Sequence, residues 1–231
     1  MPRPTPKPIS FVPNIVTYTD IVTEFKKICK NTQFIKNITG NTIQKMNLNT
    51  NHDSKKIGKI KSLEYKHNKS INISYYTDNK KFYKSYMFDT ENLTIEEISN
   101  ILKKYIIEVD NHIYAAQLST ICEFITPQIY SFYINIEPSD DSFIIQFIII
   151  MEYIDIEHDT VEFNKNNDGK LKELREINEC LQHHSLTHND LALRNIRIMK
   201  KSKKILIYDW GESFISKLNH GLENNKHNPI I

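Results

Sequence analysis

The sequence predicts an α+β fold in two parts: a small antiparallel sheet carrying one helix, followed by a reduced, mainly helical part. Short β-rich runs occupy residues 57–88, a helical stretch covers 93–124, and an apolar hairpin follows at 128–155. An amphipathic helix then spans 168–184. A chain of 231 residues is long enough for one sizeable domain or for two small lobes that share a cleft.

The N-terminal end stands apart from these elements. Proline occupies every second position from residue 2 to residue 8, so we expect residues 1–14 to be a disordered, Pro-rich leader of the polyproline type. Residues 15–56 are then an N-terminal extension. Within this extension, apolar residues at helical spacing predict a helix over 15–30, with a face formed by Ile15, Ile21, Val22, Phe25 and Ile28.

The first β-rich region contains three runs, at 57–65, 70–76 and 81–88. They are rich in β-branched and aromatic residues, which favour strands. The sequences KHNK and TDNK between the runs are typical of turns. We therefore expect three consecutive antiparallel strands.

The next region combines a helix with a hairpin. Thr94 and Glu97 have the spacing of a capping box at the start of the helical stretch 93–124, and Pro127 should end the stretch. The hairpin joins a strand at 128–137 to one at 142–155. Because this second strand is almost entirely apolar, we expect it to be central and buried on both faces.

The C-terminal region should contain one helix and a pair of short strands. The helix at 168–184 repeats apolar residues at helical spacing, namely Leu171, Leu174, Ile177 and Leu181. Two short strands, at 196–199 and 204–209, surround the turn sequence KKSK. The residues just before and just after these two strands carry the strongest chemical signal in the chain.

Composition narrows the functional classes. The net charge of +2 gives no electrostatic reason to expect nucleic acid or an anionic membrane as a partner. Three widely spaced cysteines argue against a disulfide scaffold or a cysteine zinc site and favour a reducing compartment. No secretory signal is visible, and the apolar run at 143–154 is too short to span a bilayer.

These observations predict an intracellular, cytoplasmic protein. Abundant Asn, Ile and Lys are typical of an AT-rich genome, such as that of a large DNA virus or a parasite. For a viral protein, the host cytoplasm or the virion would be the corresponding location.

Three polar residues are arranged as phosphoryl transfer requires. Asp190 and Asn195 lie in the string His188-x-Asp-x-x-x-x-Asn, and Asp209 follows the second short strand. Phosphoryl transfer needs a carboxylate that accepts the proton of the attacking hydroxyl, a task for Asp190. It also needs hard oxygen ligands for Mg²⁺, a task for Asn195 and Asp209. His188 is expected to be a structural hydrogen-bonding residue of the loop.

These strings resemble a known family. The sequence HNDLALRNI (188–196) is similar to the HRDLAARN catalytic loop of eukaryotic-type protein kinases, and DWG (209–211) stands where these kinases have DFG. Gly211 would let the backbone turn sharply after the metal ligand. Asn189 replaces the arginine that, in the family, pairs with a phosphorylated activation loop, which indicates that this form of regulation is absent.

The resemblance implies a two-lobed, protein-kinase-like fold. Residues 57–155 would be the N-lobe and hinge, and residues 156–231 a reduced C-lobe with the catalytic and metal-binding loops. No APE motif follows Asp209. The chain thus resembles compact, atypical kinases of the RIO and tRNA-modification (KEOPS) types, with the lower C-lobe truncated.

The resemblance also assigns the ion pair that holds the phosphates. Lys84 would be the lysine of the third strand that contacts the α- and β-phosphates, with Lys80 and Lys81 nearby in the sequence. A carboxylate on the following helix should pair with this lysine. Glu108 is the preferred candidate, and Glu97 and Asp110 are its competitors.

The remaining ATP contacts follow from the same resemblance. Met151 would be the gatekeeper of the hinge, and the backbone groups of Glu152 and Tyr153 would bind adenine. Of the glycine-rich loop only Gly58 remains, and an alternative alignment would use Gly40.

The predicted function is therefore an ATP- and Mg²⁺-dependent phosphotransferase, a protein serine/threonine kinase with a protein substrate. A partner protein could complete the reduced C-lobe. Two alternatives remain open. One is a pseudokinase or partner-binding module, which the degenerate glycine-rich loop favours. The other is a small-molecule kinase or ATPase of the same fold.

Overall fold

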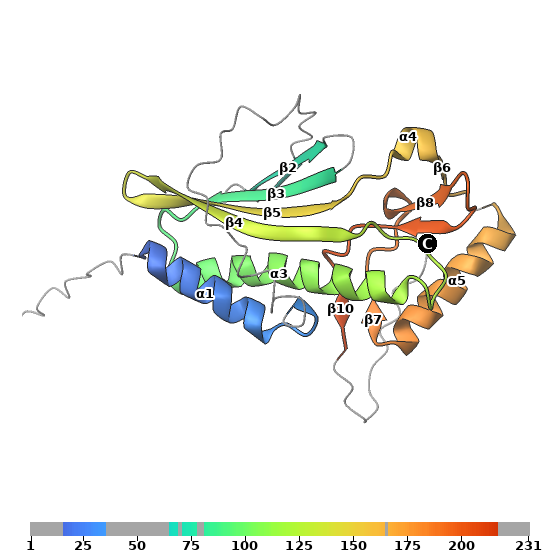
Figure 1. The fold of residues 1–231 in the computed structure, drawn as a ribbon, viewed down its shortest axis with the longest axis horizontal. Coiled ribbons are helices and arrows are strands. Elements are labelled where there is room, and N and C mark those ends of the chain that lie inside the picture. Colours follow the sequence, from blue (N-terminus) through green and yellow to red (C-terminus); the bar gives the residue numbers. More distant parts are fainter. Residues whose placement is uncertain (1–15, 36–64, 69–70, 78–80, 165, 217–231) are drawn as a thin grey trace, which may run out of the picture.

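The protein was analysed as a computed structural model that describes residues 16–35, 65–68, 71–77, 81–164 and 166–216. Helices pack against an antiparallel sheet, so the predicted α+β class is confirmed (Figure 1). The predicted leader 1–14 lies outside the described residues, as do Gly40, Gly58 and most of the strand predicted at 57–65.

A five-stranded antiparallel sheet forms the first part of the fold. Its strands have the order β1-β2-β3-β5-β4, so that β5 lies between β3 and β4 (Figure 1). The bounds are β1 Tyr65–Asn68, β2 Ile71–Thr77, β3 Lys81–Asp89, β4 Ile129–Ser139 and β5 Ser142–Glu152. One prediction here is wrong, because residues 66–68, expected in a turn, belong to β1 and pair with β2.

Strand β5 is buried on one face only, which corrects the expectation that both faces would be buried. Four alternate residues face the core, namely Ile145, Phe147, Ile149 and Met151. The residues between them are half-buried. An antiparallel sheet can leave its second face partly open to water, because no crossover helix has to cover that face.

Two helices, α1 (Tyr18–Asn31) and α3 (Ile95–Leu118), lie on the buried face of the sheet (Figure 1). The capping box of Thr94 and Glu97 is present as predicted, and Thr17 with Asp20 forms a second one at α1. Helix α3 ends at Leu118, so the helical stretch predicted over 93–124 is too long at its C-terminal end. Residues 119–123 form turns in its place.

The C-terminal part contains short elements around one longer helix, α5 (Asp168–His183). Strands β8 (Ile196–Met199) and β9 (Ile205–Ile207) lie close to their predicted positions and pair with each other. The other elements are α4 (Ile156–Asp159), β6 (Thr160–Glu162), β7 (Leu186–Thr187), a 3₁₀ turn (Leu193–Asn195) and β10 (Phe214–Ile215). Strand β6 adds to the β8–β9 pair, and β10 pairs with β7.

The residues that the structure describes form two hydrophobic cores, and α3 contributes to both. The first lies between the sheet, α1 and α3 as far as Ile113, with Phe147 and Leu102 among its fully buried residues. The second surrounds Trp210 and Leu181, and it includes Ala115 and Leu118 from the end of α3. Helix α3 therefore connects the two cores, so a residue in its middle lies near the boundary between them.

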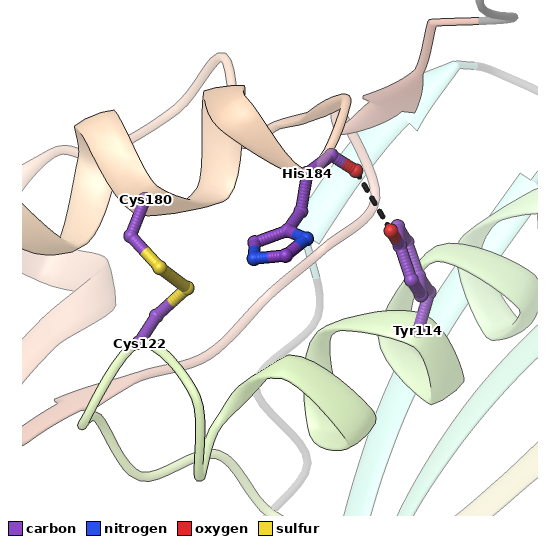
Figure 2. Close-up of a disulfide and its surroundings, with 4 residues drawn as sticks. All are labelled: Tyr114, Cys122, Cys180 and His184. Carbon is purple, nitrogen blue, oxygen red and sulfur yellow. Dashed lines mark hydrogen bonds between the residues drawn. A yellow bond between two sulfur atoms is a disulfide. The ribbon is translucent and has the colours of Figure 1, made fainter.

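A disulfide joins Cys122, just after α3, to Cys180 of α5 (Figure 2). The expectation that the cysteines stay unpaired is therefore wrong, since the fold brings two residues separated by 58 positions together. His184 lies beside the bridge, its ligand atoms within 4.8 Å of the sulfurs. Because the sulfurs are bonded to each other, they offer no thiolate to a metal. Nearby, the Tyr114 hydroxyl donates to the His184 carbonyl at 2.7 Å (Figure 2).

Among the described residues, no helix has both the length and the apolar character that crossing a bilayer requires.

Candidate functional site

Lys84 lies at the centre of a buried ion cluster. Its Nζ donates to Glu108 Oε1 at 2.7 Å and to Asp209 Oδ1 at 3.0 Å. The three residues come from β3, from α3 and from the segment after β9. Lys84 is only 7% exposed and Glu108 only 6%, whereas 44% of the Asp209 side chain is exposed. The cluster is closed on the side of the protein core and open at Asp209.

Strand geometry explains why a lysine points into the core. Side chains alternate between the two faces of a strand, so Lys84 shares a face with the buried Tyr86 and Phe88. In the register with β5, Lys84 lies opposite the buried Ile149. A charged amine in such surroundings needs carboxylate partners, because burial of an unpaired charge is very costly.

Glu108 binds the cluster with both carboxylate oxygens. Oε1 accepts the hydrogen bond from Lys84, and Oε2 accepts one from the hydroxyl of Tyr86 at 2.5 Å. The ring of Tyr86 also stacks on Tyr105, one turn before Glu108 on α3. These contacts hold the carboxylate in one orientation, facing the Lys84 ammonium.

The charges in the cluster reinforce each other. Burial by itself would lower the pKa of Lys84, but the Glu108 and Asp209 carboxylates outweigh burial and place it well above its ordinary value. Burial would raise the pKa of Asp209, but the charge and hydrogen bond of Lys84 outweigh it and lower that pKa. Lys84 is therefore protonated and Asp209 ionised at neutral pH.

Asp209 has a left-handed backbone conformation, with φ of 64°. A non-glycine residue in this region is uncommon and is found at tight turns and functional sites. The turn predicted at Gly211 is also present, because the N–H of Ser213 donates to the carbonyl of Trp210 at 3.2 Å. Gly211 lies against the ion cluster, because a Cβ atom there would be in van der Waals contact with Glu108 Oε2, at 3.4 Å.

The loop after β7 presents a second charged group. Arg194 Nη2 donates to both oxygens of Asp190, at 2.6 and 2.5 Å. Asn195 Nδ2 donates to Asp190 Oδ2 at 2.9 Å and to the Asp190 backbone carbonyl at 3.0 Å. Asn195 thereby turns its amide nitrogen toward Asp190, which leaves its amide oxygen as the atom suited to a hard metal ion.

Each charged group includes a residue at the same end of the β8–β9 pair. Asn195 directly precedes β8 and Asp209 lies two residues after β9, and Ile196 pairs with Ile207 in antiparallel register. The N–H of Tyr208 donates to the carbonyl of Asn195 at 3.2 Å. Short contacts therefore connect Lys84 to Asp209, and Asp190 to Asn195, at this end of the hairpin.

His188 is a structural hydrogen-bonding residue of the loop, as predicted. Its Nδ1 accepts the backbone N–H of Asp190 at 3.2 Å, and its Nε2 lies 3.3 Å from the carbonyl of Tyr208. Burial lowers the pKa of His188, so the ring is neutral and a proton on Nε2 satisfies both bonds. The ring also packs against Trp210 at a centroid distance of 4.5 Å.

Trp210 anchors the segment that carries Asp209. The indole is fully buried in the second core, and its Nε1 donates to Thr126 Oγ1 at 3.0 Å. Next to it, Asn111 Nδ2 donates to the carbonyl of Ser213 at 2.6 Å. The same helix that carries Glu108 therefore also holds the backbone just after Asp209.

The predicted hinge residues lie at the end of β5. Met151 is buried on the core face of the sheet. The backbone N–H of Glu152 donates to the carbonyl of Gln128 at 2.8 Å, and adenine binding by the backbone groups of Glu152 and Tyr153 stays a prediction. For Tyr153 we find no backbone hydrogen-bond partner among the described residues.

The competing carboxylates lie elsewhere. Glu97 caps the N-terminus of α3. Asp110 accepts hydrogen bonds from the backbone of residues 33–35. Lys81 pairs in register with Glu152 at the start of β3. Of the carboxylates considered for Lys84, only Glu108 contacts it.

Sequence reasoning missed two members of this site. Tyr86 has a detectable signal, because it lies two positions after Lys84 on a strand and so shares its face. Arg194 lies four positions after Asp190, but the loop between them has no regular period from which a contact could be inferred.

Comparison with known proteins adds little. No protein-family model matches the chain, and no curated protein matches it in sequence. Among solved structures, it is similar to the kinase PK-1 of the Cydia pomonella granulovirus, with 16% identity and a TM-score of 0.36. The match covers 68% of this chain and 52% of that chain, so this chain spans about half the length of the kinase.

Proposed function

We propose that this protein is a phosphotransferase of the protein-kinase-like, two-lobed fold, which uses Mg-ATP and acts on a protein serine or threonine hydroxyl. One observation carries the proposal: Lys84 bonds to Glu108 and to Asp209, which are 24 and 125 positions away. This lysine, helix glutamate and metal-binding aspartate are the set that a kinase-like active site requires in one place.

The residues fit the cofactor in chemical type. Asp209 offers a carboxylate and Asn195 an amide oxygen, and hard oxygen ligands of this kind suit Mg²⁺. Lys84 supplies a fixed positive charge suited to phosphate oxygens, and the partly exposed Asp209 side chain leaves the cluster accessible. When bound, Mg-ATP supplies the transferable phosphoryl group and the charge that neutralises its oxygens.

Asp190 is the proposed base for the substrate hydroxyl. Its side chain is 27% exposed, and its carboxylate is held by Arg194 and Asn195. The hydrogen bond from Asn195 keeps one oxygen oriented. The exposed Arg194 side chain has to move or share its contact when a hydroxyl approaches Asp190, because it now donates to both oxygens.

Transfer of labelled phosphate tests the proposal. Purified protein with [γ-³²P]ATP, Mg²⁺ and a mixture of protein substrates should label protein, and Asp190→Ala should lower the rate about 100-fold or more. Asp141→Ala, in the exposed β4–β5 turn, is the matched control and should keep the rate of the wild type. Equal rates in wild type and Asp190→Ala would contradict the assignment.

The occupied carboxylate of Asp190 favours a second candidate, a pseudokinase that binds nucleotide or a partner without transfer. Both oxygens of Asp190 already accept hydrogen bonds from neighbours. A thermal-shift titration separates the candidates. Stabilisation by Mg-ATP without label transfer supports the pseudokinase, and label released as free phosphate supports an ATPase of the same fold.

A further inference from the structure

Asp110 is a buried carboxylate with no part in the proposed chemistry. Its exposure is 6%, and it accepts three backbone N–H groups from one short segment. Oδ1 accepts from Phe34 and Ile35, both at 2.8 Å, and Oδ2 accepts from Gln33 at 3.1 Å. An ionised carboxylate that collects several backbone donors makes strong, charge-assisted hydrogen bonds. Asp110 therefore fixes the segment after α1 against α3.

The rest of the N-terminal segment packs along the same helix. Ile21, Phe25 and Cys29 recur at every fourth position of α1 and are buried in the core that α1 shares with α3. Phe34 stacks on Tyr114 of α3 with 4.2 Å between ring centroids. Residues 17–35 thus contact α3 along much of its length, and we call them the clamp.

Asp110 and Glu108 lie on opposite sides of α3. An α-helix turns by roughly 100° per residue, so side chains two positions apart point in nearly opposite directions. Glu108 points to Lys84 of the sheet, and Asp110 points to residues 33–35 of the clamp. One turn of helix is therefore held from both sides, by an ion pair on one and by three hydrogen bonds on the other.

We propose that Asp110 is a positioning residue, through which the clamp holds α3 where Glu108 meets Lys84. Release of residues 33–35 would remove the three hydrogen bonds that hold this turn of α3 on the side opposite Lys84, and Glu108 would lose its fixed place. The clamp then sets the affinity for Mg-ATP, and this last consequence rests on the proposed function. The clamp contains none of the proposed catalytic residues, and this proposal gives it a role at the site.

The chain contains two internal reporters. Cys29 is the free cysteine of the clamp and is fully buried, and burial raises the pKa of its thiol to about 12, so docked Cys29 should react slowly with alkylating reagents. Lys84 reacts slowly with a free acylating reagent from solution while its ammonium is buried and paired with Glu108. The charge of Asp110 also raises the pKa of Cys29, so faster alkylation of Cys29 in Asp110→Ala than in the equally uncharged Asp110→Asn reports release of the clamp. Acylation of Lys84 reports loss of the ion pair.

The experiment compares the wild type with Asp110→Ala and with the milder Asp110→Asn, which keeps one acceptor oxygen. Iodoacetamide labelling of Cys29 and acetic anhydride labelling of Lys84 are followed by peptide mass spectrometry, and Mg-ATP affinity is measured by calorimetry. Leu174→Ala, in the second core, is the control for a general loss of stability. Asp110→Ala should speed both labelling reactions and weaken Mg-ATP binding by about 5- to 150-fold, the usual range of coupling between sites. Asp110→Asn should lie between.

Each outcome decides a different point. Faster labelling of Cys29 with unchanged labelling of Lys84 overturns the positioning role, because the clamp would then open without moving Glu108. Unchanged labelling of Cys29, or changes no larger than those in Leu174→Ala, overturns it as well. If the wild type does not bind Mg-ATP, the proposed function fails, and the two labelling rates still test whether Asp110 positions α3.

Discussion

The two charged groups of the candidate site are built in different ways. Lys84, Glu108 and Asp209 come from three elements, and the contacts of Lys84 span 24 and 125 positions. Asp190, Arg194 and Asn195 lie within five positions of one loop. The first group is closed in by the core around Lys84, whereas 69% of the Arg194 side chain is exposed.

This difference separates what the fold must hold from what a loop can form by itself. The Lys84 cluster exists only when β3, α3 and the segment after β9 are all in place, so it depends on both cores. The contacts of Asp190 with Arg194 and Asn195 need only the local backbone conformation of the loop. They can rearrange when a substrate binds. We therefore expect mutations in the first group to reduce stability strongly and mutations in the second to reduce it weakly.

The largest effect on stability should come from Glu108→Ala. This change leaves the buried Lys84 without its nearest carboxylate and removes the acceptor for Tyr86. Loss of one partner of a buried ion pair costs about 3–5 kcal/mol, which urea unfolding can measure. Glu176→Ala removes an exposed ion pair on α5 and should cost under about 1 kcal/mol. Similar losses of unfolding free energy in both variants would show that the buried ion pair stabilises the fold no more than the exposed one.

Acid should reduce stability through His112, a buried residue of α3 near Trp210. Burial lowers the pKa of His112 to about 4, whereas an unfolded histidine titrates near 6.5. Between these values the unfolded chain binds a proton that the folded chain does not, so stability falls as pH falls from about 6.5 to about 4. The loss from this group is about 3 kcal/mol at 1.36 kcal/mol per pKa unit.

Urea unfolding of the wild type and of His112→Gln at pH 7.0 and pH 4.5 checks this expectation. Gln can still donate to the carbonyl of Pro127, as His112 Nε2 does. The variant should lose less stability on acidification than the wild type. The stability of the variant should still depend on pH to some extent, because burial lowers the pKa of His188 as well. An identical loss of stability on acidification in the wild type and the variant would contradict a buried, neutral His112.

The smallest effect should come from Arg194→Ala. The guanidinium is exposed, and exposed ion pairs contribute about 1 kcal/mol or less. Thermal unfolding should therefore shift by only a few degrees, since about 1 kcal/mol corresponds to about 2–4 °C for a chain of this size. A loss comparable to that of Glu108→Ala would contradict the contrast between the two groups.

The sequence predicts features that depend on local pattern. The capping box of Thr94 and Glu97, the helix at 168–184 and the strands on both sides of KKSK follow from short-range rules, and the structure contains them. The face of β3 that carries Lys84 follows from the alternation of side chains along a strand. These rules need only neighbours in the sequence.

Features set by distant contacts were missed. The disulfide joins Cys122 to Cys180 across 58 positions, and spacing alone gives no pairing. The early end of α3 and the half-open face of β5 depend on which elements pack against them. Asp110 was considered for Lys84, yet only the fold shows that it faces residues 33–35. Similarly, the left-handed turn at Asp209 is not visible in the sequence DWG.

An ATP acyl-phosphate probe tests the central claim most directly, because it transfers its acyl group to a lysine beside the bound phosphates. The proposal predicts that Lys84 is acylated in the presence of Mg²⁺, that excess Mg-ATP blocks the reaction, and that Asp209→Ala weakens it. Peptide mass spectrometry identifies the modified lysine. Modification of other lysines only, or labelling of Lys84 that Mg-ATP does not block, would contradict a nucleotide site at this cluster.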